Sequence, residues 1–222
     1  MYRYIFFDLD GTLTDSKEGI FNCVRYALEK MGEPIPTDDV LKNFIGPPLH
    51  DSYIRYCGFT REQALLGVQL FRERYTTIGK FENAAAPGML DLCRRLKERG
   101  YVLALSSSKP ERMCEQICEK FGFAPFLATV TGSPPAGDDW EKADVIRETM
   151  RRLNLTEADK DAILMIGDRK FDVLGARECG IACVGVEFFG YAAPGELEEA
   201  GAAAVVRSAE ELETFLANAE TK

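Results

Sequence analysis

The hydrophobic positions along the chain fall into short apolar runs separated by longer amphipathic stretches. The runs are rich in aliphatic residues and have the length of buried strands: Tyr4–Leu9, Val102–Ser106, Leu127–Val130, Ala162–Ile166, Ala182–Val186 and Ala203–Val206. Between them, helical periodicity ends at glycines or polar turns, which predicts helices over Met89–Arg99, Glu111–Phe121, Lys142–Leu153 and Val173–Cys179. This alternation predicts an α/β fold, a doubly wound parallel sheet of the Rossmann-like kind with helices on both faces.

Residues 16–82 break the alternation, because they show helical periodicity with no convincing strand. One helical face carries Ile20, Val24, Ala27, Leu28 and Met31, and a second amphipathic run covers Gln63–Tyr75. We therefore expect a small all-helical cap domain over 16–82, inserted into a catalytic core made of 1–15 and 83–222. Small and polar residues at Asp15–Glu18 and Asn83–Pro87 would allow hinges there.

Charge and cysteine usage narrow the classes of function. The formal net charge is −9 and basic residues are nowhere dense, which argues against a nucleic acid polymer or an anionic membrane as partner. A small anionic substrate would need a bound cation and a few basic groups. The 7 cysteines are scattered without a Cys-x-x-Cys pair, which predicts neither disulfides nor a zinc site. With no apolar stretch long enough for a membrane span, we expect a cytoplasmic protein.

Two aspartates stand at the end of the first strand run, Asp8 directly after Ile5-Phe6-Phe7 and Asp10 two residues later. Parallel α/β sheets bind ligands at the carboxyl ends of their strands, and the run delivers Asp8 to that edge. Asp8 and Asp10 are two residues apart, so in an extended chain they face the same way, and their charges repel unless a cation lies between them. Mg²⁺ suits such a pair because it prefers carboxylates, water and phosphate as ligands. An ordinary Asp-Gly turn would explain Gly11, but not the buried strand before it.

The run Asp8-Leu9-Asp10-Gly11-Thr12 resembles the first motif of the haloacid dehalogenase superfamily. The resemblance implies that Asp8 is a nucleophile that forms an aspartyl-phosphate, and that Asp10 is the general acid and base. Covalent catalysis of this kind divides phosphoryl transfer into two easier steps.

The superfamily's second motif is a hydroxyl at the end of the next strand, where this chain has Ser106-Ser107-Ser108-Lys109-Pro110. Counted back from Lys109, the phosphoglycolate phosphatase pattern selects Ser107, whereas the pattern of sugar phosphomutases selects Ser106. We favour Ser107, with Ser108 and Lys109 beside it as substrate-binding residues for the phosphate. Ser108 is also expected to cap the following helix, with Pro110 in its first turn.

The third and fourth motifs complete the resemblance. Lys142, at the start of a predicted helix, matches the lysine that neutralises charge around the nucleophile and the phosphate. Gly167-Asp168 followed by Asp172 matches the fourth motif, which implies a magnesium site formed by Asp8, the backbone carbonyl of Asp10, and Asp168. Asp172 would hold a metal-bound water or Lys142. Two helix-capping aspartates would explain either acid, but not the ordered set.

Asp10 gives the chemistry a direction, because dehalogenases and phosphonate-cleaving relatives lack this acid. The helical insert resembles the caps of phosphoglycolate phosphatases and 5'-nucleotidases, and Phe44–Leu49 looks like the segment those caps present to the site. Phosphoglycolate phosphatases have Thr-Asn before the lysine, where this chain has Ser107-Ser108, and this difference weakens the case for phosphoglycolate as the substrate. We expect a Mg²⁺-dependent phosphatase, monomeric or homodimeric, acting on phosphoglycolate or a nucleoside 5'-monophosphate. The alternatives are a sugar phosphomutase and a non-catalytic binding module.

Overall fold

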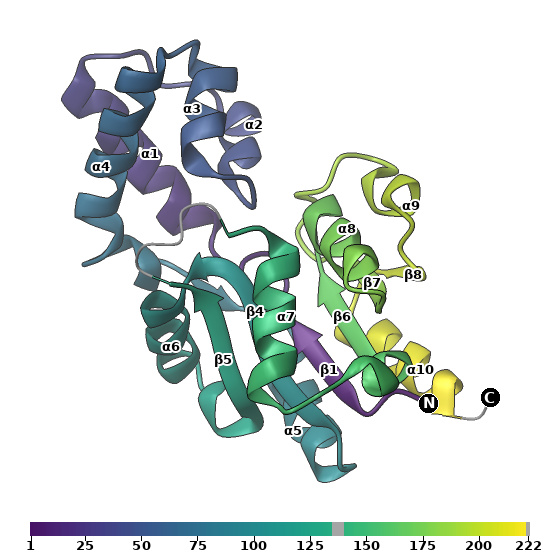
Figure 1. Ribbon diagram of the computed structural model, residues 1–222. Coiled ribbons are helices and arrows are strands. Elements are labelled where there is room, and N and C mark those ends of the chain that lie inside the picture. Colours follow the sequence, from purple (N-terminus) through teal and green to yellow (C-terminus); the bar gives the residue numbers. More distant parts are fainter. Residues whose placement is uncertain (135–139, 221–222) are drawn as a thin grey trace. The chain divides into compact units, whose positions relative to one another are not determined.

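The computed structural model describes residues 1–134 and 140–220 of the chain (Figure 1). They form two compact units, one made of Met1–Thr14 with the chain from Ala85 onward, the other of Asp15–Ala84. The boundaries that we expected, after residues 15 and 82, lie one and two residues away from these. The chain passes between the units through β2 (Thr14–Asp15) and β3 (Ala84–Ala85), two short strands that pair with each other.

The first unit contains a six-stranded sheet in the order β5-β4-β1-β6-β7-β8, and each neighbouring pair is parallel. The strands are β1 (Tyr4–Phe7), β4 (Val102–Pro110), β5 (Leu127–Ser133), β6 (Ile163–Gly167), β7 (Ala182–Val186) and β8 (Ala204–Val206). Every apolar run that we singled out thus forms a strand of one parallel sheet. The prediction of an α/β fold is confirmed.

Helices cover both faces of this sheet (Figure 1). On one face Ile5 and Phe7 pack in a cluster with residues of α5 (Met89–Glu98), α6 (Glu111–Lys120) and α10 (Ala209–Glu220). On the other face Phe6 packs with residues of α7 (Lys142–Arg152), α8 (Lys170–Glu178) and α9 (Glu196–Ala200). Successive residues of a strand point to opposite faces, so β1 feeds both cores. The short 3-10 helices of this unit are η3 (Ala124–Phe126) and η4 (Glu157–Ala162).

The end of β4 corrects one expectation. The strand continues to Pro110, with an irregular register against β5 between Ser106 and Pro110, and α6 begins only at Glu111 with Pro110 as its N-cap residue. The prediction that Ser108 caps this helix is therefore wrong. Serine favours helix caps, but here Ser106 and Pro110 pair with β5, and Ser108 between them lies within the extended strand.

The second unit is helical, as its periodicity predicted. It consists of α1 (Lys17–Met31), α2 (Asp38–Leu41), η1 (Lys42–Phe44), α3 (Leu49–Cys57), α4 (Arg61–Tyr75) and η2 (Gly79–Phe81). The start of α4 is fixed by a capping box between Thr60 and Gln63. Phe44 and Ile45, which we expected in a ligand-facing segment, are buried, and the ring of Phe44 packs edge-on against Tyr53 in the unit's own core.

The cysteines agree with a structural role. All seven belong to the described residues and none is in a disulfide; six are buried, and only Cys57 is partly exposed. Burial raises the pKa of Cys57, which makes its thiol less reactive at neutral pH. No helix among the described residues is both long and apolar enough to cross a membrane.

Candidate active site

Lys142, the third motif, lies at the centre of the predicted site and contacts a residue of each of the other three motifs. Its Nζ is 2.7 Å from Oδ1 of Asp8 and 2.7 Å from Oδ1 of Asp172, and it donates a hydrogen bond of 3.1 Å to the carbonyl oxygen of Ser106. Burial alone would lower the pKa of Lys142, but the carboxylates of Asp172 and Asp8 outweigh it and hold the pKa above its ordinary value. The lysine is therefore a buried cation held between two acids.

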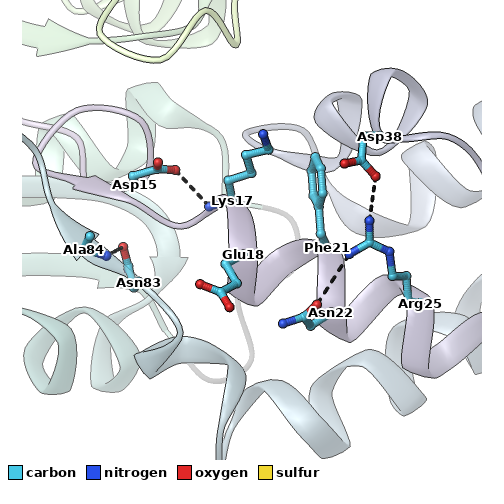
Figure 2. A pocket seen from close by; sticks show the side chains of 9 residues that line it. All are labelled: Asp15, Lys17, Glu18, Phe21, Asn22, Arg25, Asp38, Asn83 and Ala84. Atoms are coloured by element: carbon cyan, nitrogen blue, oxygen red, sulfur yellow. Dashed lines mark hydrogen bonds and ion pairs between the residues drawn. The ribbon is translucent and has the colours of Figure 1, made fainter.

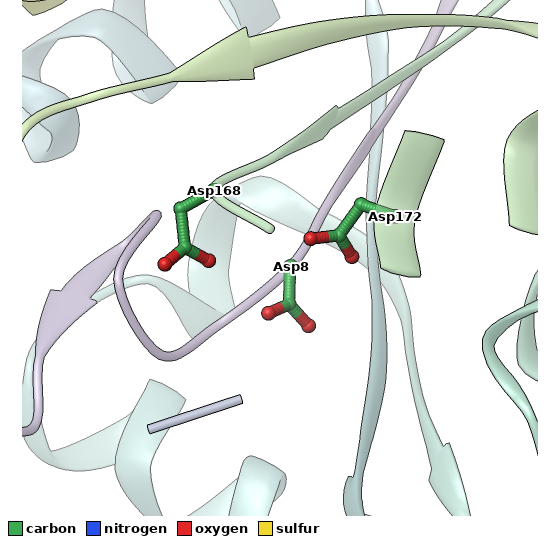
Figure 3. A group of neighbouring side chains, drawn as sticks. All are labelled: Asp8, Asp168 and Asp172. Atoms are coloured by element: carbon green, nitrogen blue, oxygen red, sulfur yellow. The ribbon is translucent and has the colours of Figure 1, made fainter. Parts of the chain in front are cut away.

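Strand ends bring the acids together. Asp8 follows β1, and its N–H donates to the carbonyl oxygen of Ile166 in the neighbouring strand β6. Asp168 follows β6, and Asp172 lies in the first turn of α8. Carboxylate oxygens of Asp8, Asp168 and Asp172 all lie within 4.8 Å of one another (Figure 3). Three carboxylates thus share one small volume beside a single ammonium group.

Asp168 and Asp172 are both buried, and burial disfavours their charged forms. Asp168 is 3% exposed, and neither of its carboxylate oxygens has a hydrogen-bond partner among the described residues. Burial, together with the charges of Asp172 and Asp8, raises the pKa of Asp168 well above its usual range. Burial also raises the pKa of Asp172 to about 6, although Lys142 opposes the shift. The described residues therefore leave the carboxylate of Asp168 without a partner, whereas that of Asp172 is paired with Lys142.

A divalent cation fits this arrangement. All the donors are carboxylate oxygens, the ligands that hard cations such as Mg²⁺ prefer. A cation would partner the unsatisfied oxygens of Asp168 and would offset the repulsion among three carboxylates whose charge one lysine neutralises only in part. The group includes Asp172, which we had predicted only as a support for a metal-bound water or for Lys142. The predicted contribution of the Asp10 backbone carbonyl stays a prediction.

Two glycines allow the close packing of this site. Gly11 has φ of +81°, and a Cβ built there would lie 2.1 Å from Oδ2 of Asp168. A Cβ at Gly167 would lie 2.2 Å from Cγ of Asp172. Any side chain at either position would collide with an acid of the cluster, so glycine is required by space at both, and at Gly11 by backbone conformation as well.

Asp10, the predicted general acid and base, forms an ion pair with Lys109. Nζ of Lys109 is 2.7 Å from Oδ2 of Asp10, and both side chains are largely buried. The other oxygen, Oδ1 of Asp10, is buried without a hydrogen-bond partner among the described residues. We predicted Lys109 as a ligand for the substrate phosphate, and the structure adds a contact with Asp10 that the sequence did not indicate.

The serines at the end of β4 differ in their surroundings. Ser107 is 3% exposed and its Oγ accepts a hydrogen bond of 3.4 Å from the N–H of Lys109. Oγ of Ser106 is fully buried and has no partner among the described residues, while its carbonyl oxygen accepts from Lys142. Ser108 is exposed. Ser106 thus contacts Lys142, the partner of Asp8, whereas Ser107 contacts Lys109, the partner of Asp10. Which of the two hydroxyls is that of the second motif stays open.

The helical unit has a hollow of its own, with a volume of about 370 Å³ (Figure 2). The ring of Phe21 lies between two cations, Nζ of Lys17 at 5.5 Å and the guanidinium carbon of Arg25 at 5.6 Å from its centroid. Arg25 also pairs with Asp38. The hollow is lined by Asp15, Lys17, Glu18, Phe21, Asn22, Arg25, Asp38, Asn83 and Ala84. None of these is a predicted catalytic residue.

Comparison with known proteins decides the family. A family model described as haloacid dehalogenase-like hydrolase matches residues 5–186. The chain belongs to this family. The resemblance inferred from the four motifs is confirmed, and the matched range includes every predicted catalytic, substrate-binding and metal-binding residue.

Relatives of this hydrolase have several names. A 5'-nucleotidase from Pseudomonas aeruginosa is 37% identical over 196 residues, which cover 88% of this chain and 87% of that protein. The crystal structure of a predicted phosphatase from Clostridium acetobutylicum is 38% identical with a TM-score of 0.90, covering 98% of this chain and 99% of that one. Tyrosine-protein kinase PtkA from Mycobacterium tuberculosis is 33% identical over 82% of this chain, which spans only 61% of the kinase's length. Phosphoglycolate phosphatases match at lower identity, 24% and 29% for two of them.

An ion pair beside the site was not predicted from the sequence. Arg169, between the two motif aspartates, forms an ion pair of 2.9 Å with Glu196, and both side chains are nearly buried. Arg169 stands inside a recognised motif, which is a signal that it lies near the site. Glu196 lies 27 residues further along the chain, and nothing in the local pattern indicates its partner.

Proposed function

We propose that this hydrolase is a Mg²⁺-dependent phosphatase that cleaves a small phosphate monoester, phosphoglycolate or a nucleoside 5'-monophosphate, through an aspartyl-phosphate. The observation that supports the proposal most strongly is the cluster of Asp8, Asp168 and Asp172 around Lys142. Membership of the haloacid dehalogenase-like hydrolases and the phosphatases among the relatives support the class of phosphoric monoester hydrolase.

Asp8 is the proposed nucleophile. Because Lys142 holds Oδ1, we assign the attack on phosphorus to Oδ2. The bond from Oδ2 to phosphorus forms as the ester P–O bond breaks, and the leaving oxygen takes a proton from Asp10. In the second step Asp10 accepts a proton from water, whose oxygen attacks phosphorus and releases inorganic phosphate and free Asp8.

The basic residues of the site position the acids and counter their charge. Lys142 stabilises negative charge at Asp8, and Lys109 restrains the carboxylate of Asp10. The hydroxyl and N–H groups of Ser107 and Ser108 are proposed to bind the phosphate oxygens. Asp8, Asp168 and the Asp10 carbonyl would hold Mg²⁺, with Asp172 beside them. When bound, the cation supplies positive charge that orients the phosphate and offsets charge in the transition state.

The relatives favour a nucleoside monophosphate over phosphoglycolate. The relative named 5'-nucleotidase is 37% identical to this chain, whereas two named phosphoglycolate phosphatase are 24% and 29% identical. The three serines at 106–108 also depart from the phosphoglycolate pattern. A cytoplasmic location and a monomeric or homodimeric state stay predictions.

A substrate panel tests the proposal. The purified chain is supplied with Mg²⁺ and with nucleoside 5'-monophosphates, phosphoglycolate and glucose 1-phosphate, and inorganic phosphate is measured. We expect release from at least one monoester, abolished by chelator and by Asp8→Asn. Conversion of glucose 1-phosphate to glucose 6-phosphate without phosphate release would replace the proposal with the phosphomutase alternative, and inactivity across the panel would contradict both.

A further inference from the structure

Arg169 and Glu196 form an ion pair at the edge of the acidic cluster. Nε of Arg169 donates to Oε1 of Glu196 at 2.9 Å and Nη2 donates to Oε2 at 3.4 Å, so the guanidinium binds both oxygens of the carboxylate. Only 10% and 11% of the two side chains are exposed. Burial removes both charges from water at a substantial cost, so such a pair needs accurate geometry and further hydrogen bonds to persist.

Each partner takes part in a further hydrogen bond next to Asp168 and Asp172, Arg169 through its backbone N–H and Glu196 through its carboxylate. The N–H of Arg169 donates to Oδ2 of Asp172 at 3.1 Å. Oε1 of Glu196 accepts a second hydrogen bond, of 3.0 Å, from the N–H of Lys170 at the start of α8. A carboxylate at the N-terminus of a helix is favoured by the helix dipole. The backbone at the start of α8 is therefore fixed by two hydrogen bonds, one from Arg169 to Asp172 and one from Lys170 to Glu196.

Glu196 is itself held in place on the sheet. The next residue, Leu197, is fully buried, and a Cβ built at Gly185 of β7 would lie only 2.8 Å from its Cδ1. The N–H of Ala193 donates to Oε2 of Glu196 at 3.3 Å. Burial alone would raise the pKa of Glu196, but the hydrogen bonds from Arg169 and from the Lys170 N–H hold it below its ordinary value, so the carboxylate stays charged.

We propose that Arg169 and Glu196 are positioning residues that keep Asp168 and Asp172 facing Asp8 for the divalent cation, an inference that rests on the proposed function. Asp168 needs such support from its neighbours, because its own oxygens have no hydrogen-bond partner among the described residues. Groups that orient metal ligands in this way typically change metal affinity or activity about 10- to 100-fold when removed.

A direct measurement of Mg²⁺ binding tests the pair. Calorimetric titration of the full chain with Mg²⁺ compares the wild type, Arg169→Gln, Glu196→Gln and the double variant, at a temperature where circular dichroism shows each to be folded. Each single change should raise the Kd for Mg²⁺ about 10-fold or more. The double variant should bind no more weakly than the weaker single variant, because either change breaks the same ion pair.

A matched control exists on the same helix. Arg147 and Glu178 form an ion pair of 2.6 Å between α7 and α8, with about half of each side chain exposed. Arg147→Gln and Glu178→Gln should leave the Kd unchanged. In the Arg169 and Glu196 variants, raising Mg²⁺ to saturation should restore kcat with KM for the ester unchanged, which general damage to the fold would not produce.

If Arg169→Gln does not fold, Lys170→Pro tests the same inference. Lys170→Pro removes one hydrogen bond to Glu196, and proline suits the first position of α8 because Arg169 before it has φ of −125° and ψ of 156°. With Lys170→Ala as control, loss of one hydrogen bond should raise the Kd about 2- to 10-fold. Unchanged Kd values in folded Glu196→Gln and Lys170→Pro would overturn the inference while wild-type Mg²⁺ binding and phosphate release stand. A wild type that shows neither would overturn the proposed function itself.

Discussion

Replacing Gly11 by alanine would have two effects, strain in the backbone and a collision with Asp168, which a second variant can separate. The backbone at Gly11 has φ of +81°, a conformation that costs an L-residue roughly 1–2 kcal/mol. The added Cβ would also lie 2.1 Å from Oδ2 and 2.4 Å from Cγ of Asp168, so the carboxylate must move. Gly100 offers the matched comparison, because its φ is +90° and a Cβ there meets nothing within 4 Å. Gly100→Ala therefore has the backbone cost without the collision.

The two variants share the backbone cost but should differ greatly in activity. A loss of 1–2 kcal/mol lowers the Tm of a chain of this size by roughly 2–8 °C; we expect Gly100→Ala in that range, and Gly11→Ala to lose at least as much because of the added collision. Displacing a catalytic group by about 1 Å can cost about 100-fold in rate, so we expect kcat/KM of Gly11→Ala to fall by about that factor. Gly100→Ala should keep the wild-type value.

The assay is phosphate release from the best substrate of the panel, at a temperature well below the Tm of both variants. Thermal unfolding followed by circular dichroism gives the stability comparison. The reasoning would be refuted if Gly11→Ala were as active as Gly100→Ala, because the collision with Asp168 would then have no consequence for the reaction.

Three other predictions follow from the same geometry. Lys142→Met leaves Asp8 and Asp172 without their shared cation, so the free energy of unfolding from denaturant titration should fall by about 3–5 kcal/mol; an unchanged value would contradict this account of the pair. In chelator, burial raises the pKa of Asp172 to about 6 and that of Asp168 well above its usual range, so the folded state binds these protons more tightly than the unfolded chain does. Their contribution to the free energy of unfolding should therefore fall as the pH rises from about 4 through the folded pKa of Asp172, where a flat profile would disagree. Ser107→Ala should raise KM for the ester more than Ser106→Ala, and the reverse order would assign the second-motif hydroxyl to Ser106.

The strands could be predicted because their signal is local. A strand covered on both faces has to be apolar throughout, and Ile163–Gly167 is buried at every position, so its sequence alone marks it. The helical unit was detectable for a similar reason, since Ile20, Val24 and Leu28 repeat at helical spacing and are all buried. The ends of elements were less predictable, as the extension of β4 through Ser108 shows, because pairing with a neighbouring strand overrides local capping preference.

The contacts of the site depend on residues that are far apart in sequence. Lys142 and Asp8 are separated by 134 positions, and only the order of family motifs indicated that they belong together. The ion pairs of Lys109 with Asp10 and of Arg169 with Glu196 had no such guide. Charged residues follow no periodic pattern that reveals their partners, so these pairs become visible only when the strand order is known.

The distribution of thiols gives the unmodified enzyme a natural attachment point. Six of its seven cysteines are buried, and Cys57, at the end of α3, is the one that solvent reaches. A maleimide fluorophore or spin label should therefore react at one position without any engineered substitution, most readily at mildly alkaline pH because burial raises the pKa of that thiol. The label would report on the helical unit while leaving every residue of the proposed catalytic cluster, all in the other unit, chemically untouched.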